Sequence, residues 1–344
     1  MRGNHNKPRL LIAMRDELPE GFFGPCEWAR LKAATDIVSG FPYTDFDAPA
    51  GAEALAEADI LLAAWGTPSL TKERLRRAPR LRMVAYAAAS VRTVAPAEFW
   101  EASDILVTTA AAAMAIPVAE FTFAAIIMCG KDVFRLRDDH RAERGAGGFG
   151  SRRGLNLPYL GNHSRRVGIV GASRIGRLVM GMLAHSKFEI AVYDPFLTAD
   201  EAAALGAMKM DLHDLLAWSD TVSLHAPILP ETRHMIGARE LALMADHAVL
   251  INTARGWLVD HDALLAEARS GRLRILIDTP DPEPLPADSP FYDLPNVVLT
   301  PHIAGALGNE LRALSDLAIT EIERFVGGLA PLHPVHSRDL ERIA

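Results

Sequence analysis

Residues 166 to 177 read RVGIVGASRIGR, an apolar run that ends in a glycine and continues as a helix-like segment. A strand, a tight turn and a helix in this order form the dinucleotide-binding turn, whose usual pattern is Gly-x-Gly-x-x-Gly. Here residues 171 to 176 read GASRIG, so Ser173 replaces the middle glycine. Backbone N–H groups and the positive end of the helix dipole can hold a pyrophosphate at such a turn. Because serine is small and its hydroxyl can donate to a phosphate oxygen, we expect weakened rather than abolished binding.

An acidic residue follows at a spacing that supports this reading. The next apolar run, EIAVYD, ends at Asp194, which is 194 − 176 = 18 residues after the last glycine. A carboxylate there accepts hydrogen bonds from the adenosine ribose and repels the 2′-phosphate of NADP. Taken alone, Asp194 before a proline is also typical of a turn or a helix cap. Together with the glycine turn, it favours NAD as the cofactor.

Short apolar runs alternate with helical patterns along the whole chain. They lie at residues 9–14, 59–64, 82–86 and 104–108, and again at 166–171, 189–194, 220–225, 247–252, 274–278 and 296–300. Uninterrupted aliphatic runs separated by helices predict parallel sheets covered on both faces, and two series predict two α/β domains. Between the series we expect one long helix over 117–144, with Pro117 in its first turn, and then a glycine-rich surface loop at 145–154. A second long helix is expected over 309–327.

The composition excludes several classes of protein. A net charge of −7 lacks the basic face that nucleic-acid binding requires. Two cysteines cannot form a disulfide framework, so we expect buried thiols and a reducing compartment. The N-terminal apolar run is too short for a signal peptide, and the longest apolar stretch, 109–130, is interrupted by a proline and a glutamate. We therefore expect a cytoplasmic protein without a membrane span or a metal site.

Three polar residues of the second series have complementary chemistry. Arg255 follows an apolar run and precedes a glycine, and a guanidinium there can grip a carboxylate with two parallel hydrogen bonds. His302 follows another apolar run and a proline, and Glu283 lies among prolines 302 − 283 = 19 residues before it. Singly, each residue is more often structural. Together they have the roles of anchor, proton carrier and orienting carboxylate.

Several longer strings are shared with one known family. The strings are VGIVGASRIGR, SDTVSLHAPILPETRHMIG, INTARGWLVDHDALLAEARSG, EPLPADSPFYDLPNVVLTPHIAG and FVGGLAPLHPV. In this order they closely resemble the D-isomer-specific 2-hydroxyacid dehydrogenases. The resemblance implies an α/β fold of two domains, a Rossmann-type NAD-binding domain at 126–308 inserted into a flavodoxin-like substrate domain at 1–125 and 309–344. It also implies an active site in the cleft between the domains and a homodimer.

The resemblance assigns roles residue by residue. Arg255 matches the arginine that binds the substrate carboxylate, His302 the general acid/base, and Glu283 the carboxylate that pairs with this histidine and favours its protonated form. The positions that match the cofactor site are Gly171, Ser173, Arg174, Ile175, Asp194, His225, Pro227, Thr253 and Asp278, the last of these as a partner of the nicotinamide carboxamide. For His225 and Pro227 a purely structural role is an equal alternative.

The substrate loops depart from the family pattern. The segment AYAAASVR has Ala89 where glycine is common, and the backbone N–H groups from Ala88 through Ser90 can hold a carboxylate only if alanine tolerates the local φ. Met114 stands where the family usually has asparagine, and ILIDTPD is apparently one residue shorter than usual. Trp65 stands in a region where phosphoglycerate enzymes commonly have arginines, so we expect a small, unphosphorylated 2-keto acid such as glyoxylate or hydroxypyruvate. The alternative for Trp65 is simple packing of the substrate domain.

Two competing functions remain open at this point. The altered glycines make an NAD-sensing regulator, similar to a corepressor, or a catalytically degraded homologue conceivable. A nucleotide-dependent methyltransferase also tolerates an imperfect glycine turn, but it has no use for the Arg255 and His302 segments. The intact combination of arginine, glutamate and histidine favours an NAD-dependent reductase of 2-keto acids.

Overall fold

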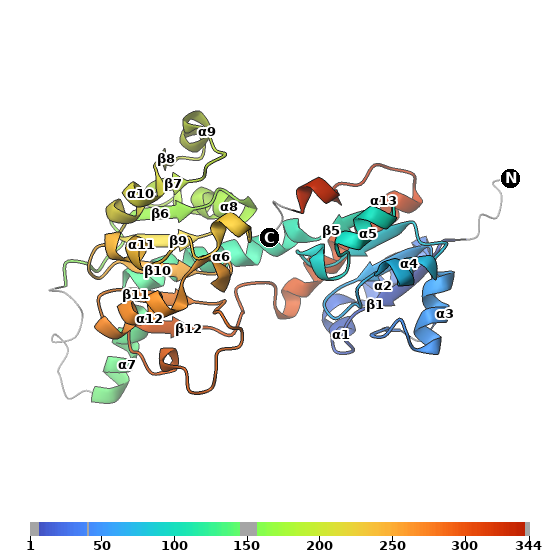
Figure 1. Ribbon diagram of the computed structural model, residues 1–344, viewed down its shortest axis with the longest axis horizontal. Helices are drawn as coiled ribbons and strands as arrows, with labels where there is room; N and C mark the ends of the chain where they lie inside the picture. The colour runs from blue at the N-terminus through green and yellow to red at the C-terminus, as the bar shows by residue number, and fades with distance from the viewer. Residues whose placement is uncertain (1–6, 40, 145–156, 341–344) are drawn as a thin grey trace. The chain divides into compact units, whose positions relative to one another are not determined.

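The computed structural model describes residues 7–39, 41–144 and 157–340 (Figure 1). The glycine-rich loop expected at 145–154 lies outside these residues. The chain divides into two compact units: unit 1 comprises residues 1–114 and 306–344, and unit 2 comprises residues 115–305. The resemblance places the domain boundaries at 125/126 and 308/309. The contacts divide the chain within the helix Ala111–Gly130 and again before Ala306.

Unit 1 is built on a sheet whose order is β13-β5-β4-β3-β1-β2. Its strands are β1 (Arg9–Ala13), β2 (Asp36–Ile37), β3 (Ile60–Ala63), β4 (Met83–Tyr86), β5 (Leu106–Thr109) and β13 (Pro334–Val335). All neighbours are parallel except β13, which pairs antiparallel with β5. The order 2-1-3-4-5 is that of flavodoxin-like folds, as expected from the resemblance. The four apolar runs of the first series therefore form strands.

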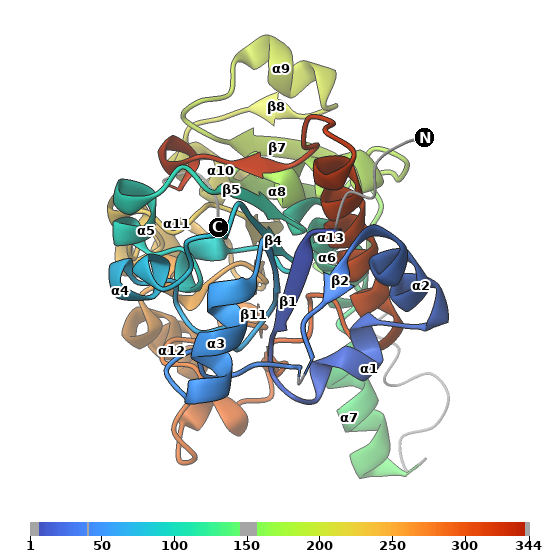
Figure 2. The same ribbon diagram turned by 90° about the vertical axis from the view of Figure 1, so that its right-hand side faces the viewer.

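Helices cover both faces of this sheet (Figure 2). They are α1 (Leu18–Phe22), α2 (Pro25–Ala34), α3 (Pro49–Glu57), α4 (Lys72–Arg76), α5 (Ala97–Ala102) and α13 (Leu311–Val326). Alternate residues of each strand enter opposite cores, so Leu11 packs with residues of α3 and α5 while Leu10 packs with residues of α2 and α13. This two-sided burial is why the strands read as uninterrupted apolar runs.

Unit 2 is built on a parallel sheet whose order is β12-β11-β10-β9-β6-β7-β8. Its strands are β6 (Arg166–Val170), β7 (Glu189–Tyr193), β8 (Met208–Lys209), β9 (Thr221–Leu224), β10 (Val249–Asn252), β11 (Arg274–Ile277) and β12 (Val297–Leu299). In chain order within the unit this is the Rossmann arrangement 3-2-1-4-5-6 with one further edge strand. The strand order reverses between β6 and β9, and ligands of open α/β sheets bind outside the carboxyl ends of the strands at such a point.

The prediction of one long helix over residues 117–144 is wrong. The structure has two helices there, α6 (Ala111–Gly130) and α7 (Val133–Glu143), separated at Asp132, whose φ of 53° is left-handed. Pro117 lies inside α6 rather than in its first turn, because the helix begins at Ala111. The other helices of unit 2 are α8 (Arg174–Leu183), α9 (Ala199–Ala204), α10 (Leu212–Trp218), α11 (Ala238–Leu243) and α12 (His261–Ser270). The helix expected at 309–327 is confirmed as α13, after a 3₁₀ turn at Gly308–Glu310.

Two further properties bear on the expected compartment. Helix α6 is long and apolar enough to cross a membrane by length and composition alone, and 44% of that window is buried inside the structure. Cys129 is buried, as expected, but Cys26 is exposed, so the expectation of two buried thiols is wrong for Cys26. Both are free thiols.

Candidate active site

The glycine turn after β6 is shaped by close backbone contacts. Gly171 has a φ of +101°, and a Cβ there would lie 2.6 Å from the backbone nitrogen of Ala226. A Cβ on Gly176 would lie 2.2 Å from the carbonyl oxygen of Gly171. These are backbone atoms that cannot move aside. Gly171 therefore allows the turn and its close contact with the chain after β9, and Gly176 allows α8 to approach the end of β6.

Ser173 is the N-cap of α8. Its φ of −62° is ordinary for a residue with a side chain, and its Oγ accepts a hydrogen bond from the Gly176 N–H at 3.3 Å. In the described part of the chain, the N–H groups of Arg174 and Ile175 have no acceptor. The turn therefore keeps free donors at the positive end of a ten-residue helix, which is the arrangement that binds a phosphate group. The structure thus fits a dinucleotide at this turn despite the serine.

Asp194, directly after β7, is bonded to the glycine turn. Its Oδ2 accepts from the Ala172 N–H at 2.7 Å, and its Oδ1 accepts from the Phe196 N–H at 2.8 Å. The second bond is the aspartate turn that the sequence left open as an alternative. Each carboxylate oxygen can accept more than one hydrogen bond, so these contacts orient the group without using up its acceptors.

His225 directly follows β9 and is almost fully buried, with its Nε2 2.9 Å from the Ser223 Oγ. Burial lowers the pKa of His225 to about 3, so the ring is neutral at physiological pH. Its Nδ1 has no hydrogen-bond partner among the described residues. A buried polar atom without a partner is uncommon. This one belongs to His225, the residue before Ala226, whose backbone lies against Gly171 of the glycine turn. Pro227 is half-buried, and its carbonyl accepts from Thr232.

Arg255 lies in a turn held by the last residue of β10. The Asn252 side chain donates to the Arg255 carbonyl at 2.8 Å and accepts from the Ala254 N–H at 3.1 Å. In the described ranges, Arg255 has no ion-pair partner, and burial lowers its pKa while Glu283 opposes this effect. A largely buried guanidinium without a carboxylate favours an external anion. Sequence reasoning did not single out Asn252, although a polar residue at the end of an apolar run was the available signal.

Glu283 and His302 meet directly. The Glu283 Oε1 lies 2.6 Å from the His302 Nδ1, and both side chains are close to half exposed. Because Nδ1 is engaged by the carboxylate, Nε2 is the nitrogen left for a ligand. An ion pair this exposed contributes little to folding, so its consequence is the orientation of the ring. The backbone of His302 is left-handed, with φ +55°, which only surrounding bonds can maintain.

Asp278 supplies those bonds. It is completely buried after β11, and its carboxylate accepts from the Thr300 Oγ1 at 2.6 Å and from the N–H groups of Ile303 and Ala304 at 2.8 and 3.0 Å. Its backbone carbonyl also accepts from the His302 N–H. The carboxylate thus encloses the turn that presents His302. The role inferred from the resemblance, binding of the carboxamide, stays a prediction, because this carboxylate already has three protein donors.

Thr253 is buried at the start of the turn that follows β10. Its Oγ1 lies 2.7 Å from the Oγ1 of Thr122 in α6, which itself donates to the Val118 carbonyl at 2.7 Å. Because a hydroxyl has one proton, Thr253 is the donor of the pair. This fixes its hydroxyl and leaves oxygen lone pairs free.

The remaining predicted site residues lie in unit 1. Trp65 follows β3, is half-buried and packs edge-on against Phe22, with ring centroids 6.0 Å apart. This is the packing role that the sequence left open for it. Gly66 lies against the side chain of Arg15, since a Cβ there would be 2.4 Å from the arginine Cγ. Arg15 is exposed after β1, and sequence reasoning missed it as a cation at this edge of the sheet.

The loop after β4 accepts alanine without strain. Ala89 is not among the described residues with positive φ, and the carbonyls of Ala88 and Ala89 accept from the Thr109 hydroxyl. In the part of the chain that is described, the N–H groups of Ala89 and Ser90 have no acceptor. The loop can therefore bind an anion through its backbone. Met114 uses its sulfur to accept from the Ala306 N–H at 3.3 Å.

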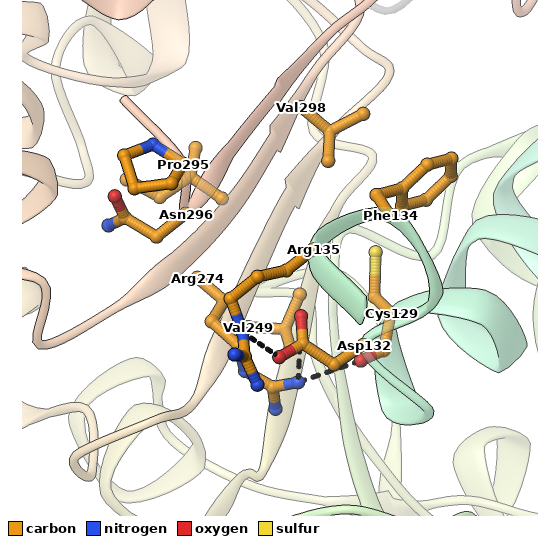
Figure 3. Close-up of a pocket in the computed structure, with 10 residues that line it drawn as sticks. Cys129, Asp132, Phe134, Arg135, Val249, Arg274, Pro295, Asn296 and Val298 are labelled. Carbon is orange, nitrogen blue, oxygen red and sulfur yellow. Dashed lines mark hydrogen bonds and ion pairs between the residues drawn. The ribbon is translucent and has the colours of Figure 1, made fainter. Parts of the chain in front are cut away.

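A small pocket in unit 2 lies at the amino ends of β10 and β11, away from the candidate site residues at the carboxyl ends (Figure 3). Arg274, the first residue of β11, donates to the Cys129 carbonyl at 2.8 Å and lies 3.9 Å from Asp132, which also accepts from Arg135. Burial raises the pKa of Cys129 to about 12, so the thiol stays protonated and unreactive. The charges of this pocket are paired internally. Among the described residues, no group of three or more His, Cys, Asp or Glu side chains could hold a metal ion.

Comparison with known proteins places the chain in one class. The model of the D-isomer-specific 2-hydroxyacid dehydrogenase NAD-binding domain matches residues 123–304, which lie inside unit 2. The chain therefore belongs to the D-isomer-specific 2-hydroxyacid dehydrogenase family, and it has that family's NAD-binding domain.

Individual relatives share this assignment at moderate identity. The chain is 33% identical to glyoxylate/hydroxypyruvate reductase B of Pectobacterium atrosepticum, over 84% of this chain and 89% of the relative. It is 28% identical to D-3-phosphoglycerate dehydrogenase of Methanocaldococcus jannaschii over 80% of this chain, and spans about half (51%) of that protein's length. A crystal structure of a phosphoglycerate oxidoreductase from Rhizobium etli has a TM-score of 0.77 at 24% identity, covering 96% of this chain and 98% of the other. That likeness concerns the fold.

Proposed function

We propose that this protein is an NAD-dependent oxidoreductase that transfers a hydride between NADH and a small 2-keto acid, forming the D-2-hydroxy acid. The observation that carries the proposal is the 2.6 Å contact between Glu283 and the His302 Nδ1, which leaves the histidine Nε2 free to exchange a proton. Arg255, a largely buried guanidinium without an ion-pair partner in the described residues, supports the binding of a carboxylate. Family membership supports the same chemistry.

The residues of unit 2 divide the work. Arg255 binds the substrate carboxylate and polarises the neighbouring carbonyl through its second nitrogen. His302 gives a proton from Nε2 to the carbonyl oxygen, and Glu283 accepts from Nδ1 and holds the plane of the ring. Asn252 and Asp278 keep the two turns in place through the bonds described above. NADH supplies the hydride when bound.

The cofactor is held at the carboxyl ends of β6 and β7. The N–H groups of Arg174 and Ile175 bind the pyrophosphate, with Gly171 and Ser173 shaping the turn. Asp194 accepts from the ribose hydroxyls and repels a 2′-phosphate, which favours NADH over NADPH. His225, Pro227, Thr253 and Asp278 line the position of the nicotinamide half.

The substrate we propose is glyoxylate, hydroxypyruvate or a similar unphosphorylated acid. Glyoxylate/hydroxypyruvate reductase B of Pectobacterium atrosepticum is one of the relatives that this chain matches over most of both lengths, and Trp65 brings an aromatic ring to the unit 1 edge. Ala88, Ala89 and Ser90 add backbone donors for the carboxylate. Arg15, an exposed cation beside Gly66, would favour a second anionic group on the substrate.

We also propose a cytoplasmic homodimer. The edge strand β12 of unit 2 is only partly buried along its length, and a hollow beside it is lined by residues that include Phe134, Tyr292 and Val298. A partly apolar sheet edge of this kind is commonly covered in an assembly. Gel filtration with light scattering tests this, and a mass of one chain would contradict it.

The function is tested by NADH oxidation with glyoxylate, hydroxypyruvate, branched 2-keto acids and 3-phosphohydroxypyruvate. We expect turnover with an unphosphorylated acid. Activity on 3-phosphohydroxypyruvate at least equal to that on the others would contradict the proposed substrate. Equal use of NADPH would contradict the role of Asp194. If NADH binds and no acid is reduced, the protein is better described as an NAD-sensing regulator.

A further inference from the structure

His261, the first residue of α12, contacts the segment that carries Glu283. Its Nε2 lies 3.1 Å from the backbone nitrogen of Asp281, which donates to it, and its Nδ1 lies 3.1 Å from the Val259 carbonyl oxygen. The ring is half-buried and meets Phe291 edge-on, with centroids 6.1 Å apart. His261 therefore joins three parts of unit 2: the turn before α12, the 3₁₀ turn at Pro290–Tyr292 and the 281–283 segment.

These two hydrogen bonds define the tautomer of the ring. A carbonyl oxygen can only accept, so Nδ1 must be the protonated nitrogen. A backbone N–H can only donate, so Nε2 must be unprotonated. Both bonds form together only in the neutral Nδ1–H tautomer. Protonation of Nε2 would replace the bond to Asp281 by two N–H groups that face each other.

The same segment is held from a second side by Gly256. A Cβ on Gly256 would lie 2.6 Å from the carbonyl carbon of Pro280 and 2.7 Å from the Cβ of Asp281. Residues 280 and 281 are thus pressed against the Arg255 turn and bonded to His261. Glu283, two residues further on, reaches His302 from this fixed base.

We propose that His261 is a positioning residue for the proton relay, which acts through the Asp281 N–H to hold Glu283 against His302. The inference rests on the proposed function for its effect on catalysis. It does not depend on that function for the contact itself. His261 is not assigned any contact with substrate or cofactor.

The proposal carries a pH dependence. The charged and titratable groups around His261 are Asp281 on the facing segment, Asp260 before α12 and His234 on the adjoining loop. Burial is the largest influence and lowers the pKa of His261, and the charge of His234 acts in the same direction. The bond to the Val259 carbonyl and the two aspartates oppose this without reversing it. The neutral tautomer therefore holds the segment at neutral pH, and the bond is lost as the pH falls below the ordinary histidine range.

Two substitutions by amide side chains test the roles of the two ring nitrogens separately. In His261→Gln the side-chain oxygen reaches the place of Nε2 and can still accept from Asp281. In His261→Asn the amide occupies the place of Nδ1 and cannot reach Asp281. His213→Gln is a matched control, because His213 pairs with Glu240 elsewhere in unit 2.

Two readouts are measured on the full-length variants at matched thermal stability. The first is kcat for glyoxylate reduction. The second is amide exchange of a peptide containing residues 279–285, where three of seven residues are prolines and Asp281 is one of few N–H groups. We expect His261→Asn to exchange about fivefold faster and to lose about tenfold in kcat, with little change in NADH affinity. We expect His261→Gln and His213→Gln to stay within about twofold of wild type.

The pH profile adds a test that a merely structural residue would not affect. Wild-type kcat should fall on the acid side, and this fall should be reduced in His261→Gln. Equal exchange and equal kcat in the Asn and Gln variants would overturn the proposal, as would an unchanged acid limb in His261→Gln. If the wild type reduces no 2-keto acid, the proposed function fails, and the exchange measurement alone still decides whether His261 holds the segment.

Discussion

In both units helices cover two faces of a sheet that is parallel except for the edge strand β13 of unit 1, and in both the candidate residues follow the carboxyl ends of strands. The groups found there differ. In unit 1 they are mainly backbone N–H groups and an aromatic ring, at Trp65 and Ala88–Ser90. In unit 2 they are charged side chains, Arg255 and His302, each on a turn fixed by a polar residue at or just after the strand end. Under the proposed function, unit 2 supplies the cofactor turn and the charged side chains for the chemistry, and unit 1 adds backbone donors for the substrate.

The largest effect should follow from removing the proton carrier of unit 2. His302→Gln keeps a polar side chain but cannot exchange a proton, so we expect kcat for glyoxylate reduction to fall about 10³-fold. NADH affinity should stay near that of wild type, as measured by fluorescence titration. A variant with more than a tenth of wild-type kcat would break the division between the units.

Arg255→Lys should have the next largest effect. Lysine keeps the charge but loses the planar pair of donors, so we expect kcat/KM to fall roughly 10- to 100-fold. Arg239→Lys, at an exposed position on α11, is the control and should leave kcat/KM unchanged. An unchanged kcat/KM in Arg255→Lys would contradict this, because it would show that the positive charge alone, without the planar pair of donors, binds the substrate.

Gly171→Ala tests the turn that holds the cofactor. The new Cβ would meet backbone atoms at a φ of +101°, so we expect the variant to lose about 2–4 kcal/mol of stability and much of its NADH affinity. Gly181→Ala lies inside α8 with nothing within 4 Å of its Cβ, and it should stabilise unit 2 by about 0.5–1 kcal/mol. Thermal unfolding compares the two. A Gly171→Ala protein as stable as wild type would contradict the close contact with Ala226.

Ser173→Gly should have the smallest effect. It removes one 3.3 Å cap from α8, and a glycine N-cap costs only a few tenths of a kcal/mol. NADH affinity should change less than about threefold, because the free N–H groups of the turn belong to other residues. A tenfold gain in affinity would show that the serine blocks the pyrophosphate, in agreement with the weakening expected from the sequence.

Much of the fold was predictable because the strands are buried on both faces. Every apolar run named in the sequence forms a strand, whereas the two-residue strands β2, β8 and β13 have no such run. The break between α6 and α7 was missed, although Gly130 at the end of α6 and Asp132, a residue type that tolerates a left-handed backbone, were the available signals. Pro117 was misleading because prolines prefer the first turn of a helix, whereas this one lies inside α6, which begins at Ala111.

The sequence predicted the side chains proposed for the chemistry, but not the hydrogen bonds that hold those side chains in place. Glu283 and His302 could be paired from chemistry, and the structure brings them together. The contact of Asp194 with the glycine turn, and the three bonds by which Asp278 encloses the His302 turn, depend on tertiary distances that no spacing encodes. His261 was missed for the same reason, because its partner is a backbone N–H twenty residues away.

The proposed function requires that the protein reduces a 2-keto acid with NADH to the D-isomer of the hydroxy acid. It is tested most directly by incubating the wild-type protein with NADH and hydroxypyruvate and analysing the product by chiral chromatography. We expect D-glycerate in an amount equal to the NADH consumed. L-Glycerate, or bound NADH without any product from this acid or from glyoxylate, would contradict it.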